Sequence, residues 1–276
     1  MDKHTTFKIG GMSDCFVTPK DTKELIFVLK SAKRHLVPVF VLGKGSNILV
    51  SDKGIEGAVV SLVKMDAVKV EKNKITSECG ANLSAVCIAA QKSGLSGLEF
   101  AYGIPGTVGG ALFMNAGAYG GDMSGVVEGT YCLDENFNEI YLKKDEMDLS
   151  YRHSVFQKEM IITKVVFSLE PGDKEVIFEK MDELIKRRKE KQPLEFPSAG
   201  STFKRPEGNY AGTLIEKSGL KGARCGGAMV SEKHSGFVIN KGYATCADVL
   251  ELCSQVQKIV KEKTGYVLEL EPVILK

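Results

Sequence analysis

Four stretches of the chain repeat apolar residues at the spacing of an amphipathic helix. One follows Asp21 and another follows Asn82, and both of these residues can cap a helix N-terminus. The other two run from about 175 to 191 and from about 247 to 263. Glycine or proline follows each stretch, as expected where a helix ends, so the pattern predicts four helices.

Short runs rich in β-branched and apolar residues lie between these helices and predict strands. They are Val37–Leu42, Ala58–Leu62, Lys69–Lys72, Lys74–Ser77, Gly129–Leu133, Glu139–Leu142, Ile161–Leu169 and Gly236–Asn240. Some strands follow one another as hairpins and others are separated by helices, which indicates an α+β fold. Alternation near the C-terminus predicts a last strand with Glu269 and Glu271 on the same face.

Residues 170–196 differ from the chain before them, because they are charged, helical and bounded by Pro171 and Pro197. We therefore expect a domain boundary near residue 170. A basic run, Lys186–Lys191, closes the helix of this segment and suits the negative end of its dipole. This run favours a solvated helix end over a phosphate site. We detect no internal repeat and no low-complexity segment.

Composition excludes several classes of protein. Hydrophobic residues make up 43% and charged residues 26% of the 276 positions, as in soluble globular proteins. The net charge of +2 argues against a nucleic-acid coat or a lipid-binding surface. No apolar run approaches the ~20 residues of a membrane span, and no apolar secretion signal follows Met1. We expect a cytoplasmic protein, and a monomer, with no nucleic-acid or membrane partner.

Cysteine and histidine usage predicts no metal site. The seven cysteines are an odd number and include no Cys-x-x-Cys pair, so we expect reduced, mostly buried thiols. The four histidines include no pair at helical spacing with another ligand.

Two glycine-rich loops point to a phosphorylated ligand. The first, Gly43–Ile48, follows a strand and can form an anion cradle from its N–H groups, although a plain hairpin turn fits it equally well. The second spans residues 103–121, of which seven are glycine. Small residues in such number allow close contact with a flat or extended ligand. Together the loops favour one large dinucleotide-type cofactor.

Three polar positions are candidates for chemistry. Arg152 precedes a strand and could hold a carboxylate with two hydrogen bonds, although an ordinary surface arginine is the simpler interpretation. Ser201 lies in a turn and could be a nucleophile, a proton donor or a plain turn hydroxyl, but no Gly-x-Ser-x-Gly motif surrounds it. His234, in a further glycine-rich loop, reads by itself as a hydrogen-bonding loop residue.

The order of these motifs resembles one known family. Thr6–Gly11, Gly43–Asn47, Gly103–Gly110 with Asn115–Gly120, Tyr151-Arg152, Gly200–Lys204 and the terminal glutamates occur in sequence. This set resembles the UDP-N-acetylenolpyruvoylglucosamine reductase (MurB) family over essentially the whole chain. Only 48 residues separate Arg152 from Ser201, which is similar to the compact type II branch.

The resemblance implies a fold and a reaction. Residues 1–170 would form an FAD-binding fold of the vanillyl-alcohol-oxidase (PCMH) type, in two subdomains of about 1–62 and 63–170. Residues 171–276 would form an α+β substrate domain whose last strand reaches the active site. The reaction implied is reduction of enolpyruvyl-UDP-GlcNAc to UDP-N-acetylmuramate, through non-covalent FAD and with NADPH as co-substrate, early in peptidoglycan synthesis.

The resemblance also implies roles for single residues. Ser201 would be the proton donor, and Arg152 and Glu271 would stabilise an enolate-like intermediate, with Glu269 as the alternative carboxylate. The cofactor would contact Gly43, Gly45, Ser46, Asn47, Ile48, Gly103, Ile104, Pro105, Gly106, Thr107, Gly109, Gly110, Asn115, Ala116, Gly117 and Ile161. The substrate would contact Tyr119, Tyr151, Lys204, Arg205 and His234.

Two departures from the family pattern stand out. Arg205 replaces a usual asparagine, and Pro272-Val273 follows Glu271 where the family has Val-Arg. The missing terminal arginine puts a diphosphate contact in doubt. Two alternatives remain open at this point: another FAD-dependent oxidoreductase of the same fold, and a catalytically silent flavin- or nucleotide-binding module.

Overall fold

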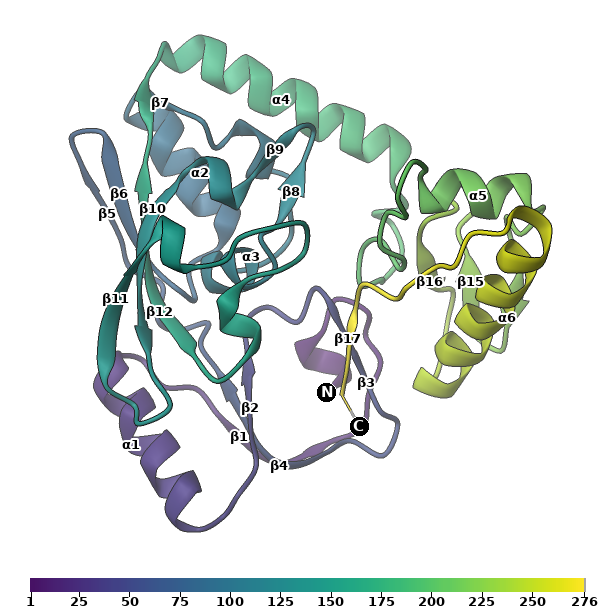
Figure 1. Cartoon of the computed structure of the whole chain (residues 1–276), viewed down its shortest axis with the longest axis horizontal. Helices are drawn as coiled ribbons and strands as arrows, with labels where there is room; N and C mark the ends of the chain where they lie inside the picture. The colour runs from purple at the N-terminus through teal and green to yellow at the C-terminus, as the bar shows by residue number, and fades with distance from the viewer. Residues whose placement is uncertain (276) are drawn as a thin grey trace. The chain divides into compact units, whose positions relative to one another are not determined.

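The structure, a computed structural model, describes residues 1–275 (Figure 1). The chain forms two compact units. The central unit comprises Cys15–Lys44 and Gly57–Arg188, and the terminal unit comprises Met1–Asp14, Gly45–Glu56 and the chain from Lys189 onward. The boundary expected near residue 170 lies inside the central unit. The assignment of 1–170 to the cofactor and of 171–276 to the substrate stays a prediction.

The helices and strands agree closely with the sequence pattern. The α-helices are α1 (Thr22–Arg34), α2 (Leu83–Lys92), α3 (Val108–Phe113), α4 (Lys174–Lys191), α5 (Ala211–Lys217) and α6 (Cys246–Thr264). The strands are β1 (Ser13–Val17), β2 (Val39–Leu42), β3 (Ile48–Val50), β4 (Ile55–Ser61), β5 (Val68–Glu71), β6 (Lys74–Glu78), β7 (Leu95–Ser96), β8 (Gly117–Ala118), β9 (Gly121–Asp122), β10 (Val127–Leu133), β11 (Glu139–Lys143), β12 (Ile161–Ser168), β13 (Glu170–Pro171), β14 (Arg224–Cys225), β15 (Ala228–Val230), β16 (Val238–Asn240) and β17 (Val273–Leu275). The four predicted helices and eight predicted strands are confirmed.

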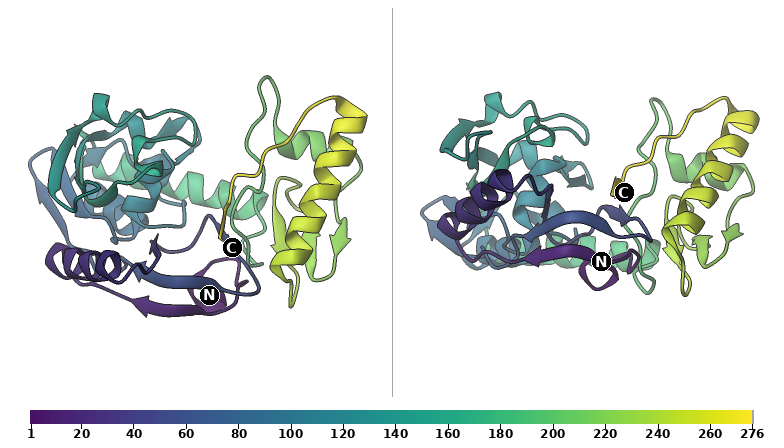
Figure 2. Two further views of the ribbon diagram at one scale, coloured as in Figure 1. Left: turned by 60° about the horizontal axis from the view of Figure 1, so that its bottom comes forward. Right: turned by 90° about the horizontal axis from the view of Figure 1, so that it is seen from below.

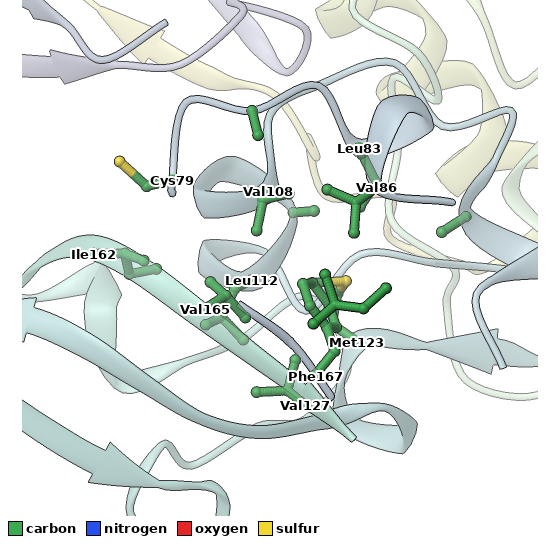
Figure 3. Close-up of a cluster of buried hydrophobic side chains, with 14 of the residues drawn as sticks. Cys79, Leu83, Val86, Val108, Leu112, Met123, Val127, Ile162, Val165 and Phe167 are labelled. Carbon is green, nitrogen blue, oxygen red and sulfur yellow. The ribbon is translucent and has the colours of Figure 1, made fainter. Parts of the chain in front are cut away.

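An antiparallel sheet forms the framework of the central unit. Its strands lie in the order β11-β10-β12-β6-β5, with Val165 of β12 opposite Ser77 of β6. Figure 3 shows Val108 and Leu112 of α3 facing Val165 and Phe167 of β12. Burial of these side chains places α3, and with it the second glycine-rich loop, against the sheet.

A second sheet, with strands in the order β1-β4-β2, leads into the first glycine-rich loop. Val39 of β2 lies opposite Ala58 of β4, and the register continues to Leu42 and Ser61. Leu42 is buried, and the loop begins at the next residue. The buried Leu42 therefore holds the start of the loop in place.

The terminal unit is built from segments near both ends of the chain. Figure 2 shows α6 beside the small β14-β15-β16 sheet, and α6 supplies much of the buried core there. Asp52 accepts hydrogen bonds from Cys246 N and Ala247 N, at 2.8 and 3.1 Å, at the start of α6. The last strand, β17, pairs in parallel with β3, so that Val273 lies opposite Ile48.

Three local predictions are wrong. Asn82 precedes α2 but its side chain makes no cap, because its Oδ1 accepts from Lys44 Nζ at 2.9 Å. The second loop contains a short helix, α3, capped by Thr107. The predicted last strand starts late, since only Leu270 forms a bridge, to Phe203, before β17 begins at Val273.

Within residues 1–275, no helix is both long and apolar enough to cross a membrane. In the same range, no three metal-ligating side chains of the His, Cys, Asp or Glu type gather into one group. The cysteines are free thiols, and all but Cys15 and Cys225 are buried. Burial raises the pKa of Cys79, Cys87 and Cys253 to about 12, which keeps these thiols protonated and unreactive.

Candidate active site

The first loop meets the second loop inside the central unit. A Cβ added at Gly43 would lie 2.5 Å from Thr107 Oγ1, so a side chain there would have to displace this hydroxyl. Asn82 and Thr107 form a β-bridge, and Lys44 Nζ donates to Asn82 Oδ1 at 2.9 Å. The two glycine-rich segments therefore contact each other, as binding of one shared ligand requires.

The rest of the first loop belongs to the terminal unit. Gly45 has φ +64°, and a Cβ there would lie 2.3 Å from His4 O. Asn47 Nδ2 donates to Glu271 O at 3.3 Å, and Val273 N donates to Asn47 O at 3.0 Å. Asn47 therefore also anchors the C-terminal segment, a role that the sequence did not reveal.

Packing within the protein, rather than a ligand, explains why several positions of the second loop are glycine. A Cβ at Gly109 would lie 2.8 Å from Cys79 Cβ, and one at Gly121 would lie 2.7 Å from the Phe100 ring. A Cβ at Gly103 would lie 3.0 Å from Arg188 Cδ. At Gly120, by contrast, nothing lies within 4 Å. The abundance of glycine is thus partly a packing requirement, which weakens its use as a sign of a cofactor.

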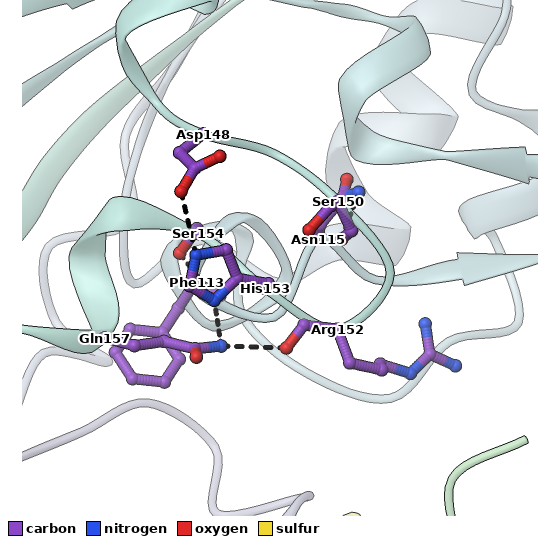
Figure 4. A network of polar contacts seen from close by, with 8 residues as sticks. All are labelled: Phe113, Asn115, Asp148, Ser150, Arg152, His153, Ser154 and Gln157. Atoms are coloured by element: carbon purple, nitrogen blue, oxygen red, sulfur yellow. Dashed lines mark hydrogen bonds and ion pairs between the residues drawn. The ribbon is translucent and has the colours of Figure 1, made fainter. Parts of the chain in front are cut away.

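Arg152 lies in a tight loop held by side-chain hydrogen bonds (Figure 4). Its φ of +56° is left-handed, a strained conformation for a residue with a side chain. Gln157 Nε2 donates to Arg152 O at 3.0 Å, and the N–H groups of Ser150 and His153 each donate to the other's carbonyl. His153 Nε2 lies 3.1 Å from Asp148 Oδ2. These contacts hold the loop against its strain.

Asn115 connects this loop to the second glycine-rich loop. Its buried Nδ2 donates to Ser150 O at 2.9 Å, while its Oδ1 accepts from Ser124 N at 2.9 Å. Ser154 Oγ donates to Phe113 O at 2.7 Å beside it. The Asn115 amide thus supports the loop of Arg152 through Nδ2, while Oδ1 fixes the amide to Ser124.

Two tyrosines of the central unit stack with arginines. The guanidinium carbon of Arg152 lies 5.1 Å from the Tyr151 ring centroid. That of Arg187 lies 5.4 Å from the Tyr119 ring centroid. Tyr119 has φ +54° and is exposed. Ile161, at the start of β12, is half-buried opposite Leu133.

Backbone pairing brings Ser201 and Glu271 together in the terminal unit. Glu271 N donates to Thr202 O at 3.0 Å, and Phe203 forms a bridge with Leu270. Thr202 is buried, and its Oγ1 accepts from Val238 N at 2.8 Å. Ser201, Glu271 and, in the other unit, Arg152 are each half-buried.

The two terminal glutamates have different surroundings. Glu269 is exposed, and its Oε2 lies 3.3 Å from Lys204 Nζ. Glu271 is half-buried, and its backbone is held on one side by Thr202 and on the other by Asn47. The two glutamates thus differ in exposure and in partners, and Lys204 lies beside Glu269.

His234 is held as a neutral imidazole. Its Nδ1 accepts from Gly236 N at 3.1 Å, so the proton of the neutral ring lies on Nε2. Its ring contacts Phe237 edge-on, with centroids 4.9 Å apart. Burial lowers the pKa of His234 below its usual range. Arg205 lies over the Tyr210 ring, with its guanidinium carbon 4.6 Å from the ring centroid.

The basic run at the end of α4 is not simply a solvated helix end. Arg187 is exposed, but Arg188 is only 9% exposed. The helical pattern contained the signal, since Ile177, Met181 and Leu184 lead to position 188 on the buried face. The sequence analysis missed this residue because it treated the run as one charged patch.

Comparison with known proteins agrees with these features. A model described as an FAD binding domain matches residues 13–134, and one described as the C-terminal domain of UDP-N-acetylenolpyruvoylglucosamine reductase matches residues 192–275. The reductase structure from Thermus caldophilus superposes with a TM-score of 0.86 at 34% identity, covering 100% of this chain and 97% of that one. The predicted fold class is confirmed.

Curated relatives of the same name are more similar still. The UDP-N-acetylenolpyruvoylglucosamine reductase of Caldanaerobacter subterraneus subsp. tengcongensis is 54% identical over 99% of this chain and 90% of its own length. That of Clostridium novyi is 52% identical over 98% of this chain and 89% of its own length. Similarity of this degree over nearly the whole length shows that the chain belongs to the UDP-N-acetylenolpyruvoylglucosamine reductase (MurB) family.

Proposed function

We propose that Arg152, Ser201 and Glu271 carry the chemistry of this enzyme. The chain is an FAD-dependent oxidoreductase that reduces UDP-N-acetylenolpyruvoylglucosamine, with NADPH as co-substrate, in peptidoglycan synthesis. The observation that carries the residue assignment is the pairing of Glu271 N with Thr202 O at 3.0 Å, which sets Ser201 and Glu271 on adjacent segments.

The residues of the two loops suit a bound FAD. Gly43 and Thr107 bring the loops together. A Cβ added at Gly110 would have only the Thr107 hydroxyl within 4 Å. The cofactor-contact set given in the sequence analysis, from Gly43 to Ile161, remains our assignment. When bound, FAD supplies the hydride that adds to the vinyl carbon of the substrate.

Arg152 binds the carboxylate of the enolpyruvyl group. Its guanidinium presents paired N–H donors that match the two oxygens of a carboxylate. Negative charge grows on that carboxylate as the double bond is reduced, so a fixed cation stabilises the transition state more than the ground state. The hydrogen bonds of Gln157 and Asn115 keep the loop of Arg152 ready for this task.

Ser201 donates a proton to the carbon next to the one reduced. A hydroxyl is a weak acid, but a carbanion-like centre is basic enough to take its proton. Glu271, on the adjacent segment, stabilises the same enolate by donating from its carboxyl group, which requires the protonated form. Tyr119, Tyr151, Lys204, Arg205 and His234 bind other parts of the substrate. We further propose that the enzyme acts as a cytoplasmic monomer.

Separating the two half-reactions tests this function. The visible spectrum is recorded anaerobically while NADPH reduces the bound flavin, and the enolpyruvyl nucleotide is then added to reoxidise it. In Ser201→Ala, flavin reduction by NADPH should stay within about twofold of the wild-type rate, since Ser201 has no part in it. Reoxidation should slow by about three orders of magnitude or more. Equal slowing of both half-reactions would contradict the role of Ser201 as proton donor.

A further inference from the structure

The outward face of α1 carries an aromatic ring among cations. One face of this helix is buried, through the side chains of Leu25, Leu29 and Ala32. Four residues at intervals of four, three and four follow the opposite face, because such intervals return to one side of a helix: Lys23, Phe27, Lys30 and Arg34. We call these four residues the outer ridge of α1. Phe27, in its middle, is 75% exposed.

The cations of the outer ridge have no partners within the protein. Across residues 1–275, no hydrogen bond, ion pair or ring contact involves their exposed side chains, which belong to Lys23, Lys30 and Arg34. Two other cations nearby are engaged. Lys20 Nζ pairs with Glu24 Oε1 at 3.0 Å. Lys33 Nζ donates to Glu135 O at 3.3 Å. The uncompensated positive charge of this region therefore lies on the outward face, around Phe27.

Positive charge is concentrated in this part of the chain. Residues 20–35 hold five lysines and arginines against two acidic residues, whereas the whole chain has a net charge of +2. Since the local excess is three and the total is two, the rest of the chain carries one net negative charge. The expectation of no membrane partner rests on charge averaged over all 276 residues, and such an average conceals a local basic surface.

A second exposed phenylalanine shows that a ring alone is not the signal. Phe178 of α4 is 58% exposed. Its neighbours at helical spacing carry a net negative charge, being Lys174, Glu175, the buried Met181 and Asp182. The surroundings of Phe178 therefore do not attract an anionic surface, whereas those of Phe27 do.

We propose that the outer ridge of α1 docks on an anionic lipid surface, with Phe27 inserted beneath the headgroups and the three cations among their phosphates. A lipid surface offers both features that the ridge requires, negative charge in the headgroup layer and an apolar layer below it. An acidic peptide would need a groove for its apolar side chains, whereas this ring stands on the convex face of a helix. A second copy of the chain, joined ridge to ridge, would bring like charges together.

This contact goes beyond the proposed reaction and is independent of it. The residues of the outer ridge belong to none of the cofactor, substrate or catalytic sets assigned above. Each basic residue near an anionic surface strengthens binding about fivefold, so three of them with one ring give a reversible contact. Salt should weaken it, because ions screen exposed charges.

Flotation of the holoenzyme with lipid vesicles tests the contact. The vesicles contain phosphatidylglycerol and phosphatidylcholine in equal parts, and pure phosphatidylcholine is the neutral reference. Wild type should float with the anionic vesicles at low ionic strength and separate from them as salt is added. Phe27→Ser should lower the partition coefficient about fivefold, since the apolar contribution is lost. Phe178→Ser is the matched control and should behave as wild type.

The cations are tested together. Lys23→Gln/Lys30→Gln/Arg34→Gln should lower the partition coefficient about 100-fold, at about fivefold for each charge. The control makes the same change of charge at three exposed lysines elsewhere in the central unit, Lys64, Lys72 and Lys144. That triple glutamine variant should lose less than about tenfold. Flavin content and the rate of flavin reduction by NADPH should match wild type in every variant, because all the substituted side chains are exposed.

Insertion of the ring has its own readout. The chain contains no tryptophan, so an indole introduced by Phe27→Trp is the only one present. Its fluorescence emission should move to shorter wavelength when anionic vesicles are added, because the ring leaves water. Phe178→Trp should show no such shift. Adsorption by charge alone would leave both indoles in water.

Several results would overturn the proposal. One is that wild type floats with anionic vesicles no better than with neutral ones. Another is that Phe27→Ser floats as wild type while the emission of Phe27→Trp stays unshifted. Capture on immobilised poly-L-glutamate that Phe27→Ser weakens, without vesicle binding, would make an acidic protein the partner. A dimer in sedimentation that Phe27→Ser dissociates would assign the ridge to a second copy of the chain.

Discussion

The loop of Arg152 and the segments of Ser201 and Glu271 are held in different ways. Beside the main-chain pair of Ser150 and His153, two side chains support the Arg152 loop: Gln157 and Asn115 donate to its carbonyls. The other pair depends mainly on main-chain groups, through Glu271 N to Thr202 O and Lys204 N to Glu269 O, with one side-chain contact from Asn47. A backbone pairing survives most substitutions, whereas a loop held by amides depends on each of them. The two regions should therefore respond differently to mutation.

Apart from that of Ser201→Ala, the largest effect is expected at Arg152 itself. Arg152→Ala removes the cation that faces the developing charge, and loss of one such group typically costs about 10²–10³ in rate. The slowing should appear in flavin reoxidation by the enolpyruvyl nucleotide, measured after anaerobic reduction. Flavin content should stay unchanged, as read from the visible spectrum of the purified variant. A colourless Arg152→Ala protein would contradict the assignment.

The terminal glutamates form a matched pair for the second comparison. Glu271→Ala should slow reoxidation by about 10²-fold, since a group that stabilises the enolate is lost. Glu271→Gln keeps an N–H donor and should retain more of the rate. Glu269→Gln breaks only an exposed contact with Lys204, so its rate should stay within about threefold of wild type. The reverse order, with Glu269 the more sensitive, would reassign the carboxylate.

A smaller effect is expected where the Arg152 loop depends on side chains. Gln157→Ala removes the donor to Arg152 O and should lower the reoxidation rate by about tenfold, as misplaced groups lose transition-state contacts. Gln157→Glu replaces that donor with a charged acceptor and should be at least as slow. Because Gln157 is exposed, the thermal melting temperature should change little. A lower melting temperature with an unchanged rate would indicate a purely structural residue.

The smallest effect concerns pH and His234. The folded pKa of this histidine lies below its unfolded value of about 6.5, because burial disfavours the charged ring. The unfolded chain therefore binds the proton more readily, so stability is complete above about pH 6.5 and declines as the pH falls below it. His234→Gln should flatten that decline in urea melts between about pH 7 and 5. His35→Gln, just after the end of α1, is the control. An identical decline in the wild type and both variants would contradict the prediction.

The sequence predicted most of the fold for a simple reason. Periodicity reports which face of each helix or strand is buried, and this signal is local. Asp21 caps α1 and Gly265 ends α6 in a left-handed conformation, as the residue types suggest. The short helix α3 escaped notice because its residues, Val108–Phe113, lie in a glycine-rich stretch typical of a loop.

The candidate site was predicted less evenly. Motif order identified the family and its fold, and the comparisons confirm both. Local pattern could not separate Glu269 from Glu271, since the alternation predicted both on one face of a strand and could not show which segments lie beside each. It also took the glycines at Gly109 and Gly121 as signs of a ligand, whereas Cys79 and Phe100 leave no room for a side chain there.

By itself, the sequence determined the elements of this protein, its family and the residue types of its chemistry, because these depend on short-range pattern and on motif order. Only the tertiary structure decided that Asn115 supports the Arg152 loop, that Glu269 pairs with Lys204, and that Arg188 is buried while Arg187 is exposed. The reason is physical: burial and pairing depend on segments far apart in the chain, and a charge shows its cost only when its neighbours are in place.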